Sequence, residues 1–152
     1  MSITLDYNTI NMQDRLLAFK VINYFNTTKN FERVEKFITR ESAISLRDLE
    51  AFVTKYAAIH GLWYYHEGTE YVLHERYKAA LTSYNKGLLD PFRRTQRVDI
   101  KFKEKNIETT IGQLNFLRFL IDSKALDWLE KNYTTIRIEL QQLKNTKTRK
   151  KN

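Results

Sequence analysis

Six basic residues lie within one short stretch of the chain, RRTQRVDIKFKEK at residues 93–105. Guanidinium and ammonium groups donate hydrogen bonds to phosphate oxygens, and an arginine can do so with two parallel N–H groups. The chemistry that this basic segment (residues 93–105) could support is therefore phosphate contact rather than bond cleavage. The predicted contact residues are Arg93, Arg94, Arg97, Lys101, Lys103 and Lys105.

A second basic cluster lies at the end of the sequence. From Lys144 onward the chain has five basic residues and no acidic one, which gives this end a charge of +5, against +4 for the basic segment and +8 for the whole chain. The remainder is close to neutral. We predict a disordered basic tail (residues 144–152) that adds nonspecific phosphate affinity. The residues predicted to do so are Lys147, Arg149, Lys150 and Lys151.

The same charges allow another interpretation. Natural sheets often carry charge on an edge strand or a solvated outer face, because charge prevents aggregation through open edges. A cationic tail can also bind an acidic protein surface instead of nucleic acid. The sequence leaves both interpretations open, so the partner is nucleic acid or an acidic protein surface.

The usual signatures of catalysis are missing from the sequence. There is no cysteine to act as a thiol nucleophile, and no serine stands in a G-x-S-x-G turn. The four glycines stand apart at positions 61, 68, 87 and 112, whereas a phosphate-cradling loop needs them clustered. We therefore expect no enzymatic activity, no catalytic residues and no cofactor.

The histidines offer a weak case for a metal site. The sequence HERYK lacks the second histidine that a zinc-binding helix needs four residues after the first. We expect no metal, and ordinary surface or hairpin roles for these residues. The histidines and nearby glutamates are His60, His66, His74, Glu67, Glu70 and Glu75.

Length and composition indicate one well-folded domain. The chain has 152 residues, 42% hydrophobic and 13% aromatic, which suffices for a single core over residues 1–143. No run approaches the length of a membrane span, and the first residues do not resemble a signal peptide. The absence of cysteine fits a reducing compartment. We expect a soluble, intracellular protein without a membrane partner, of unknown oligomeric state.

Apolar spacing predicts mostly helices in the first half of the chain. A short strand is expected in SITLDY, and three-to-four spacing predicts helices from Asp14 to Phe25 and from Phe31 to Ile38. A further helix at about residues 46–59 should end at Gly61. The segment LWYYHEGTEYVL then predicts a hairpin turning at Glu67-Gly68.

The second half predicts one helix, a hairpin and then helices again. HERYKAALTSYNKG has helical spacing, and Pro91 forces a turn after it. Alternation over residues 97–103 and 107–111 predicts a half-buried strand that folds back on itself. Thr110 and Gln113 form a predicted capping box, and helical patterns follow at residues 114–121, 125–132 and 133–143. The expected fold class is α+β, a helix-rich single domain with a small antiparallel sheet or hairpins.

Two other nucleic-acid interpretations are weaker. A helix-turn-helix at residues 113–132 would place Asp127 and Glu130 against phosphate, which they repel. Aromatic residues at 63, 64, 65 and 71 are expected in the hairpin core rather than as a platform for bases.

Three segments together resemble a known group of viral proteins. SLRDLEAFVTKYA (residues 45–57), DPFRR (residues 90–94) and TTIGQLNF (residues 109–116) are similar to elements of small uncharacterised proteins from nucleocytoplasmic large DNA viruses. The similarity covers roughly residues 44–140. Where that pattern has a cysteine after DPF, this chain has Arg93, so no thiol role is carried over. The resemblance implies a virus factory inside the host cell, or a virion, and no particular mechanism.

Together these features predict a non-enzymatic viral protein that binds nucleic acid through phosphate contacts without sequence readout. The alternative is a structural virion protein, such as a minor capsid or assembly component, that docks on viral structural proteins. A third hypothesis, an enzyme using His66 and His74, has the least support in the sequence.

Overall fold

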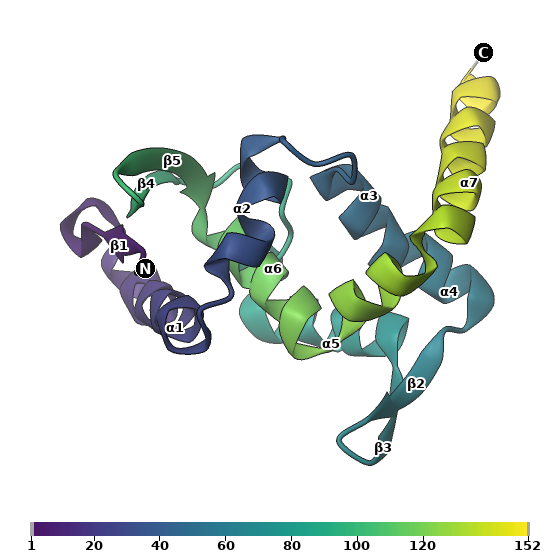
Figure 1. Cartoon of the computed structure of the whole chain (residues 1–152), viewed down its shortest axis with the longest axis horizontal. Helices are drawn as coiled ribbons and strands as arrows, with labels where there is room; N and C mark the ends of the chain where they lie inside the picture. Colours follow the sequence, from purple (N-terminus) through teal and green to yellow (C-terminus); the bar gives the residue numbers. More distant parts are fainter. Residues whose placement is uncertain (1, 152) are drawn as a thin grey trace. The chain divides into compact units, whose positions relative to one another are not determined.

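The computed structural model describes residues 2–151, and for Lys86 and residues 146–151 it describes the main chain alone. The chain forms two compact units, Met1–Leu46 with Ala80–Phe119 and Arg47–Ala79 with Leu120–Asn152. The prediction of one domain over residues 1–143 stays a prediction. The elements drawn in Figure 1 are, in order, β1 (Thr4–Leu5), η1 (Tyr7–Thr9), α1 (Met12–Thr28), α2 (Phe31–Thr39), α3 (Leu46–Ala51), η2 (Phe52–Tyr56), α4 (Ala57–His60), β2 (Trp63–His66), β3 (Thr69–Val72), α5 (Leu73–Tyr84), η3 (Lys86–Leu88), β4 (Arg97–Phe102), β5 (Lys105–Thr110), α6 (Ile111–Asp122) and α7 (Ala125–Lys151).

A three-stranded antiparallel sheet organises the first unit. Its strand order is β1-β4-β5, with Thr4 opposite Lys101 and Ile100 opposite Ile107. Strand β4 alternates between exposed and buried side chains, as the predicted half-buried strand requires. The two-residue turn at Lys103 and Glu104 has positive φ at both positions (49° and 64°), which is the geometry that closes tight hairpins.

Aromatic side chains join the helices of the first unit to this sheet. The ring of Phe25 in α1 meets Phe31 in α2 edge-on at 5.8 Å, and Phe31 meets Phe102 of β4 at 4.9 Å. All three side chains are buried. Edge-to-face pairs of this kind add to the free energy gained by burying the rings. The predicted helices from Asp14 and from Phe31 are thus confirmed, and their apolar stripes form the core against the strands.

The second unit begins with the predicted helix at about residues 46–59. It runs through α3, η2 and α4 to His60, and its middle section, η2, is one wide π-helical turn. Gly61 ends it in the left-handed conformation (φ 54°), and Leu62 N–H donates to the Ala57 carbonyl at 2.9 Å. In this unit the buried ring of Phe52 stacks on Trp128 of α7 at 6.0 Å.

Strands β2 and β3 pair as the predicted hairpin in the second unit. Trp63 lies opposite Val72 and His66 lies opposite Thr69, with the turn at Glu67 and Gly68. Both turn residues have positive φ (53° and 77°). The small sheet, this hairpin and the surrounding helices confirm the predicted helix-rich α+β class.

The last helix joins two predicted helices and continues past them. Non-helical backbone angles at Asn132 (φ −116°, ψ 15°) mark a kink between the two predicted segments, where α7 changes direction in Figure 1. Beyond Leu143 the main chain stays helical to Lys151, where a disordered tail was predicted. Lysine and arginine have good helix propensity, so main-chain hydrogen bonding can continue after the apolar spacing ends.

Candidate nucleic-acid interface

The outer face of the β4–β5 hairpin carries charges of both signs. Alternation along β4 exposes Arg97, Asp99 and Lys101, while Asp99 lies opposite the exposed Glu108 of β5. The predicted strand is confirmed, but this face has two carboxylates, on Asp99 and Glu108, as well as the two cations of Arg97 and Lys101. The face is therefore close to neutral rather than uniformly basic.

Three of the six predicted contact residues are ion-paired in the first unit. Arg97 Nε donates to Glu108 Oε1 at 2.8 Å, and Lys105 Nζ lies 3.5 Å from Glu35 Oε1. Lys103 Nζ donates to Glu32 Oε1. That hydrogen bond and the charge of Lys103 lower the pKa of Glu32. Since phosphate would have to compete with these carboxylates, the three cations are less available than their number suggests.

A hollow on this sheet has mixed charge. It encloses about 620 Å³, and carboxylates of Asp6 and Asp99 accompany Arg97 and Lys101 in its wall. We call it the mixed-charge hollow. Its remaining lining residues are Thr4, Leu5, Thr9, Val98 and Asn106. An anion approaching Arg97 here would meet two nearby negative charges.

A second hollow lies between the start of α6 and the segment that connects α5 to β4 (residues 85–96), which we call the Pro91 loop. It encloses about 410 Å³ and is lined by three arginines, with no acidic residue among its lining residues. We call it the arginine hollow. Its lining residues are Pro91, Phe92, Arg93, Arg94, Thr95, Arg97, Thr110 and Gln113. Within the described part of the chain, Arg93 and Arg94 form no ion pair.

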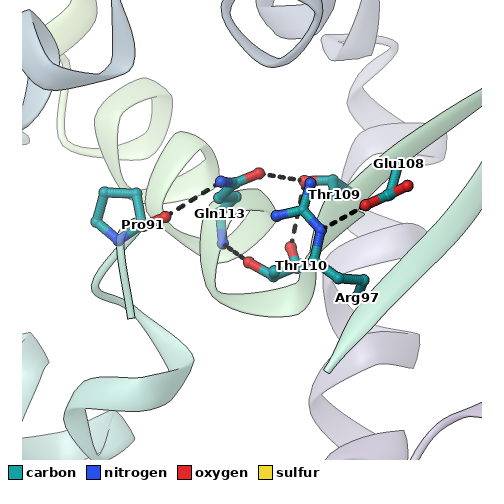
Figure 2. Close-up of polar contacts among 6 residues, drawn as sticks. All are labelled: Pro91, Arg97, Glu108, Thr109, Thr110 and Gln113. Carbon is teal, nitrogen blue, oxygen red and sulfur yellow. Dashed lines mark hydrogen bonds and ion pairs between the residues drawn. The ribbon is translucent and has the colours of Figure 1, made fainter. Parts of the chain in front are cut away.

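Side chains of α6 clamp the loop that carries these arginines. Gln113 Nε2 donates to the Pro91 carbonyl at 3.1 Å, and its Oε1 accepts from Thr109 Oγ1 at 2.8 Å, as Figure 2 shows. Asn115, almost fully buried, donates to the Leu88 carbonyl at 2.7 Å. The wall of the arginine hollow is thus held by hydrogen bonds to main-chain carbonyls.

Gly112 lets the loop approach α6 closely. A Cβ atom at this position would lie 2.9 Å from the Gly87 carbonyl oxygen and 3.3 Å from that of Asp90. The first distance is shorter than side chains tolerate, and both neighbours are main-chain atoms, so only glycine fits without a shift.

The predicted capping box is half formed. Thr110 Oγ1 accepts from Gln113 N–H at 3.0 Å, which is the expected cap of α6. The Gln113 side chain turns instead to Pro91 and Thr109. Sequence analysis therefore found Gln113 but missed its role as a clamp, and it missed Gly112 and Asn115 although all three lie within the TTIGQLNF element.

The predicted tail residues lie mostly outside what the structure describes. Side chains of Lys147, Arg149, Lys150 and Lys151 fall beyond the described side chains, so their prediction is not tested. Lys144, at the start of this segment, pairs with Asp48 Oδ1 at 3.0 Å within the second unit.

The three histidines have separate structural neighbours in the second unit. His60 Nε2 lies 2.5 Å from Glu139 Oε2, and His74 Nδ1 lies 3.2 Å from the Val53 carbonyl. The His66 ring meets Tyr71 edge-on at 5.2 Å. In the part of the chain that the structure describes, no three metal-ligating side chains come together.

The β2–β3 hairpin divides its aromatic residues between two faces. Tyr64 and Tyr71 are half-buried and stacked at 5.6 Å, and Tyr64 donates to the Ser123 carbonyl at 2.5 Å. Burial raises the pKa of Tyr64 well above its ordinary value. Trp63 and Tyr65, by contrast, are 50% and 69% exposed. The expectation that all four form hairpin core is thus right for one face and wrong for the other, because period-two alternation separates neighbouring residues.

Fold and site together define a small basic α+β protein with an arginine-lined hollow. The chain belongs to a family of unknown function, DUF7197, whose model matches residues 7–152. It is 31% identical over 128 residues to Uncharacterized protein L507 of Acanthamoeba polyphaga mimivirus, covering 77% of this chain and 49% of the relative. The chain thus spans about half the length of that curated relative. This similarity supports an origin in a large DNA virus, as the sequence resemblance predicts.

No solved structure matches the chain. Among the described residues, no helix combines the length and the apolar character that crossing a membrane requires.

Proposed function

We propose that this protein binds nucleic acid through phosphate contacts, without sequence readout and without catalysis, and that the arginine hollow is the centre of the contact. One observation carries the proposal: Arg93 and Arg94 line a hollow without an acidic lining residue and form no ion pair within the described part of the chain, whereas Arg97, which lines the same hollow, is paired with Glu108. Guanidinium groups that share a site attract phosphate more strongly than cations that each have a carboxylate partner.

The remaining predicted cations have secondary roles in this proposal. Lys103 and Lys105 are paired with Glu32 and Glu35, so they contribute mainly to long-range attraction. The cations at the end of α7 add nonspecific affinity in the same way. This role fits a virus factory in the host cell, or a virion, and it needs no cofactor.

The test compares two double variants with the same change in net charge. Arg93→Gln with Arg94→Gln should lower the affinity for nucleic acid about tenfold at low salt, because two direct phosphate contacts are lost. Lys103→Gln with Lys105→Gln should lower it less than about twofold, because those cations already have carboxylate partners. Fluorescence anisotropy with labelled oligonucleotides across a salt series measures both, and the slope against salt should flatten for the arginine variant alone.

Equal losses in the two double variants would mean that net charge alone drives binding. No binding by the unaltered chain at low salt would refute the proposed function. Thermal unfolding of each variant serves as the control for folding, since all four side chains are exposed.

The exposed aromatic face favours a second candidate, a structural virion protein that docks on viral structural proteins. Trp63 and Tyr65 are exposed, and Glu70 lies opposite Tyr65 in the hairpin. Exposed aromatics are typical of protein interfaces, whereas a carboxylate beside them opposes phosphate. Recovery of the protein with the capsid shell after removal of the genome would support this candidate, and replacement of both aromatics by serine should then abolish that recovery.

A further inference from the structure

An aromatic ring lies at the arginine hollow and is partly open to solvent. Phe92 lines the hollow, and 37% of the residue is exposed. The main chain at this residue is held locally, because Phe92 N–H donates to Asp90 Oδ1 at 2.9 Å. The lining of the hollow therefore combines three arginines with an aromatic residue.

The hollow is of a size that suits one nucleotide. Its volume of about 410 Å³ lies within the range of small-molecule sites, which begins at about 300 Å³. It is also preformed in part, because Gln113 and Asn115 hold the main chain of the loop through the carbonyls of Pro91 and Leu88. A preformed wall reduces the ordering that binding would otherwise require.

We propose that the arginine hollow binds one unpaired nucleotide of a single strand. Arg93 and Arg94 contact its phosphates, Arg97, which is paired with Glu108, adds positive charge beside them, and its base stacks on Phe92. This inference rests on the proposed function and adds to it a class of ligand, namely single-stranded rather than duplex nucleic acid.

The physical reason is that the arginines would bind the phosphates of the ligand, whereas Phe92 would bind its base. Phosphates are present on every nucleic acid, so the arginines alone would not distinguish a duplex from a single strand. Bases in a duplex are already stacked on one another and cannot reach a protein ring without unpairing. An unpaired base stacks on an aromatic side chain at no such cost, and it does so with little sequence preference.

The experiment measures binding of the full chain to three probes by fluorescence anisotropy. The probes are an oligothymidylate of about 12 nucleotides, an abasic strand of the same length and charge, and a duplex of that length. The proposal expects the oligothymidylate to bind about tenfold more tightly than the abasic strand. Equal affinity for these two strands would overturn it, while leaving phosphate binding intact.

Substitutions at Phe92 test whether this ring causes the preference for the oligothymidylate over the abasic strand. Phe92→Leu keeps an apolar side chain but removes the ring, and should bring oligothymidylate affinity down to that of the abasic strand. Phe92→Tyr keeps the ring and should retain the preference. The quantity compared is the ratio of the affinities for the oligothymidylate and the abasic strand in each variant. An unaltered preference in Phe92→Leu would overturn the proposal.

The two proposals fail in distinguishable ways. If the chain binds none of the three probes at low salt, the proposed function fails and the nucleotide site fails with it. If it binds all three with equal affinity and still loses affinity in the Arg93→Gln, Arg94→Gln variant, the function stands and only the nucleotide site is wrong. The comparison of probes uses the unaltered chain, so it holds even if a Phe92 variant folds poorly.

Discussion

The arginine hollow and the mixed-charge hollow share Arg97 but differ in their electrostatics. In the mixed-charge hollow Asp6 and Asp99 accompany Arg97 and Lys101, whereas the arginine hollow has no acidic lining residue and, besides the paired Arg97, two arginines without an ion pair among the described residues. The larger of the two thus has the less positive lining. The difference teaches that the charge of a segment is a weak guide to its binding, because carboxylates brought in by the fold decide which cations remain available.

The largest expected effect comes from breaking the wall of the arginine hollow. Gly112→Ala would place a Cβ atom 2.9 Å from the Gly87 carbonyl oxygen, so the loop must move away from α6. We expect the free energy of unfolding to fall by about 1–3 kcal/mol, as for other overpacked sites. Urea unfolding measures this loss, and nucleic-acid binding should weaken with it.

Gly87→Ala is the matched control for this prediction. A Cβ atom there would meet Thr95 Cγ2 at 3.4 Å and Arg93 Cγ at 3.7 Å, which are ordinary contacts with side chains. It should change stability by less than about 1 kcal/mol. If Gly112→Ala proved as stable as Gly87→Ala, the close approach of loop and helix would be wrong.

A smaller effect is expected from making the two hollows alike. Asp6→Asn with Asp99→Asn removes the carboxylates of the mixed-charge hollow and leaves Arg97 and Lys101 in its wall. Asparagine at position 6 can still accept the hydrogen bond from Asn8 N–H. We expect affinity for nucleic acid at low salt to rise about threefold, because phosphate contacts become available at a second place.

The control for this gain removes two other acidic side chains of the first unit. Glu41→Gln with Glu104→Gln makes the same change in net charge, and both residues are exposed and belong to neither hollow. Anisotropy titrations should show a smaller gain for this pair. The same gain in both variants would mean that the hollows do not matter and that only the overall field does.

The smallest effect concerns the pairing of Glu32 with Lys103. Because Lys103 lowers the pKa of Glu32 in the folded protein, the pair stabilises the fold above the ordinary carboxyl pKa of 4.5. That contribution is lost as pH falls through the lowered value, when Glu32 becomes protonated. Thermal midpoints of the unaltered chain and Glu32→Gln should differ slightly near neutral pH and converge in acid.

Glu104→Gln is the control for the acid titration. Within the described residues Glu104 forms no ion pair, so its replacement should leave the thermal midpoint near that of the unaltered chain. If Glu32→Gln and Glu104→Gln gave the same pH profile, the pairing of Lys103 would have no effect on stability.

Most of the fold was predictable because its signals are local. Period-two alternation around Ile100 predicted the strand, and the Glu67-Gly68 turn predicted the hairpin between β2 and β3. Apolar spacing predicted the helix at about residues 46–59 but not its wide π-helical turn at Phe52–Tyr56. The buried residues Leu49, Phe52 and Tyr56, with Val53 and Ala57, keep three-to-four spacing through this turn, so the pattern contains no trace of it.

The site was less predictable, because it depends on residues that are distant in sequence. The partners of Lys103 and Lys105 are Glu32 and Glu35, about 70 positions earlier. A count of charges along the chain does not include such partners. Gln113 was noticed as a cap, but its bond to the Pro91 carbonyl depends on how the loop folds back onto α6.

The clamp on the Pro91 loop acts only on main-chain atoms. Gln113 and Asn115 bond to carbonyl oxygens, and Gly112 makes room for two more. The side chains at positions 92–95 can therefore change without breaking any of these contacts. Such a loop can vary in its side chains and keep the same backbone frame, so a relative could have other groups in place of these arginines.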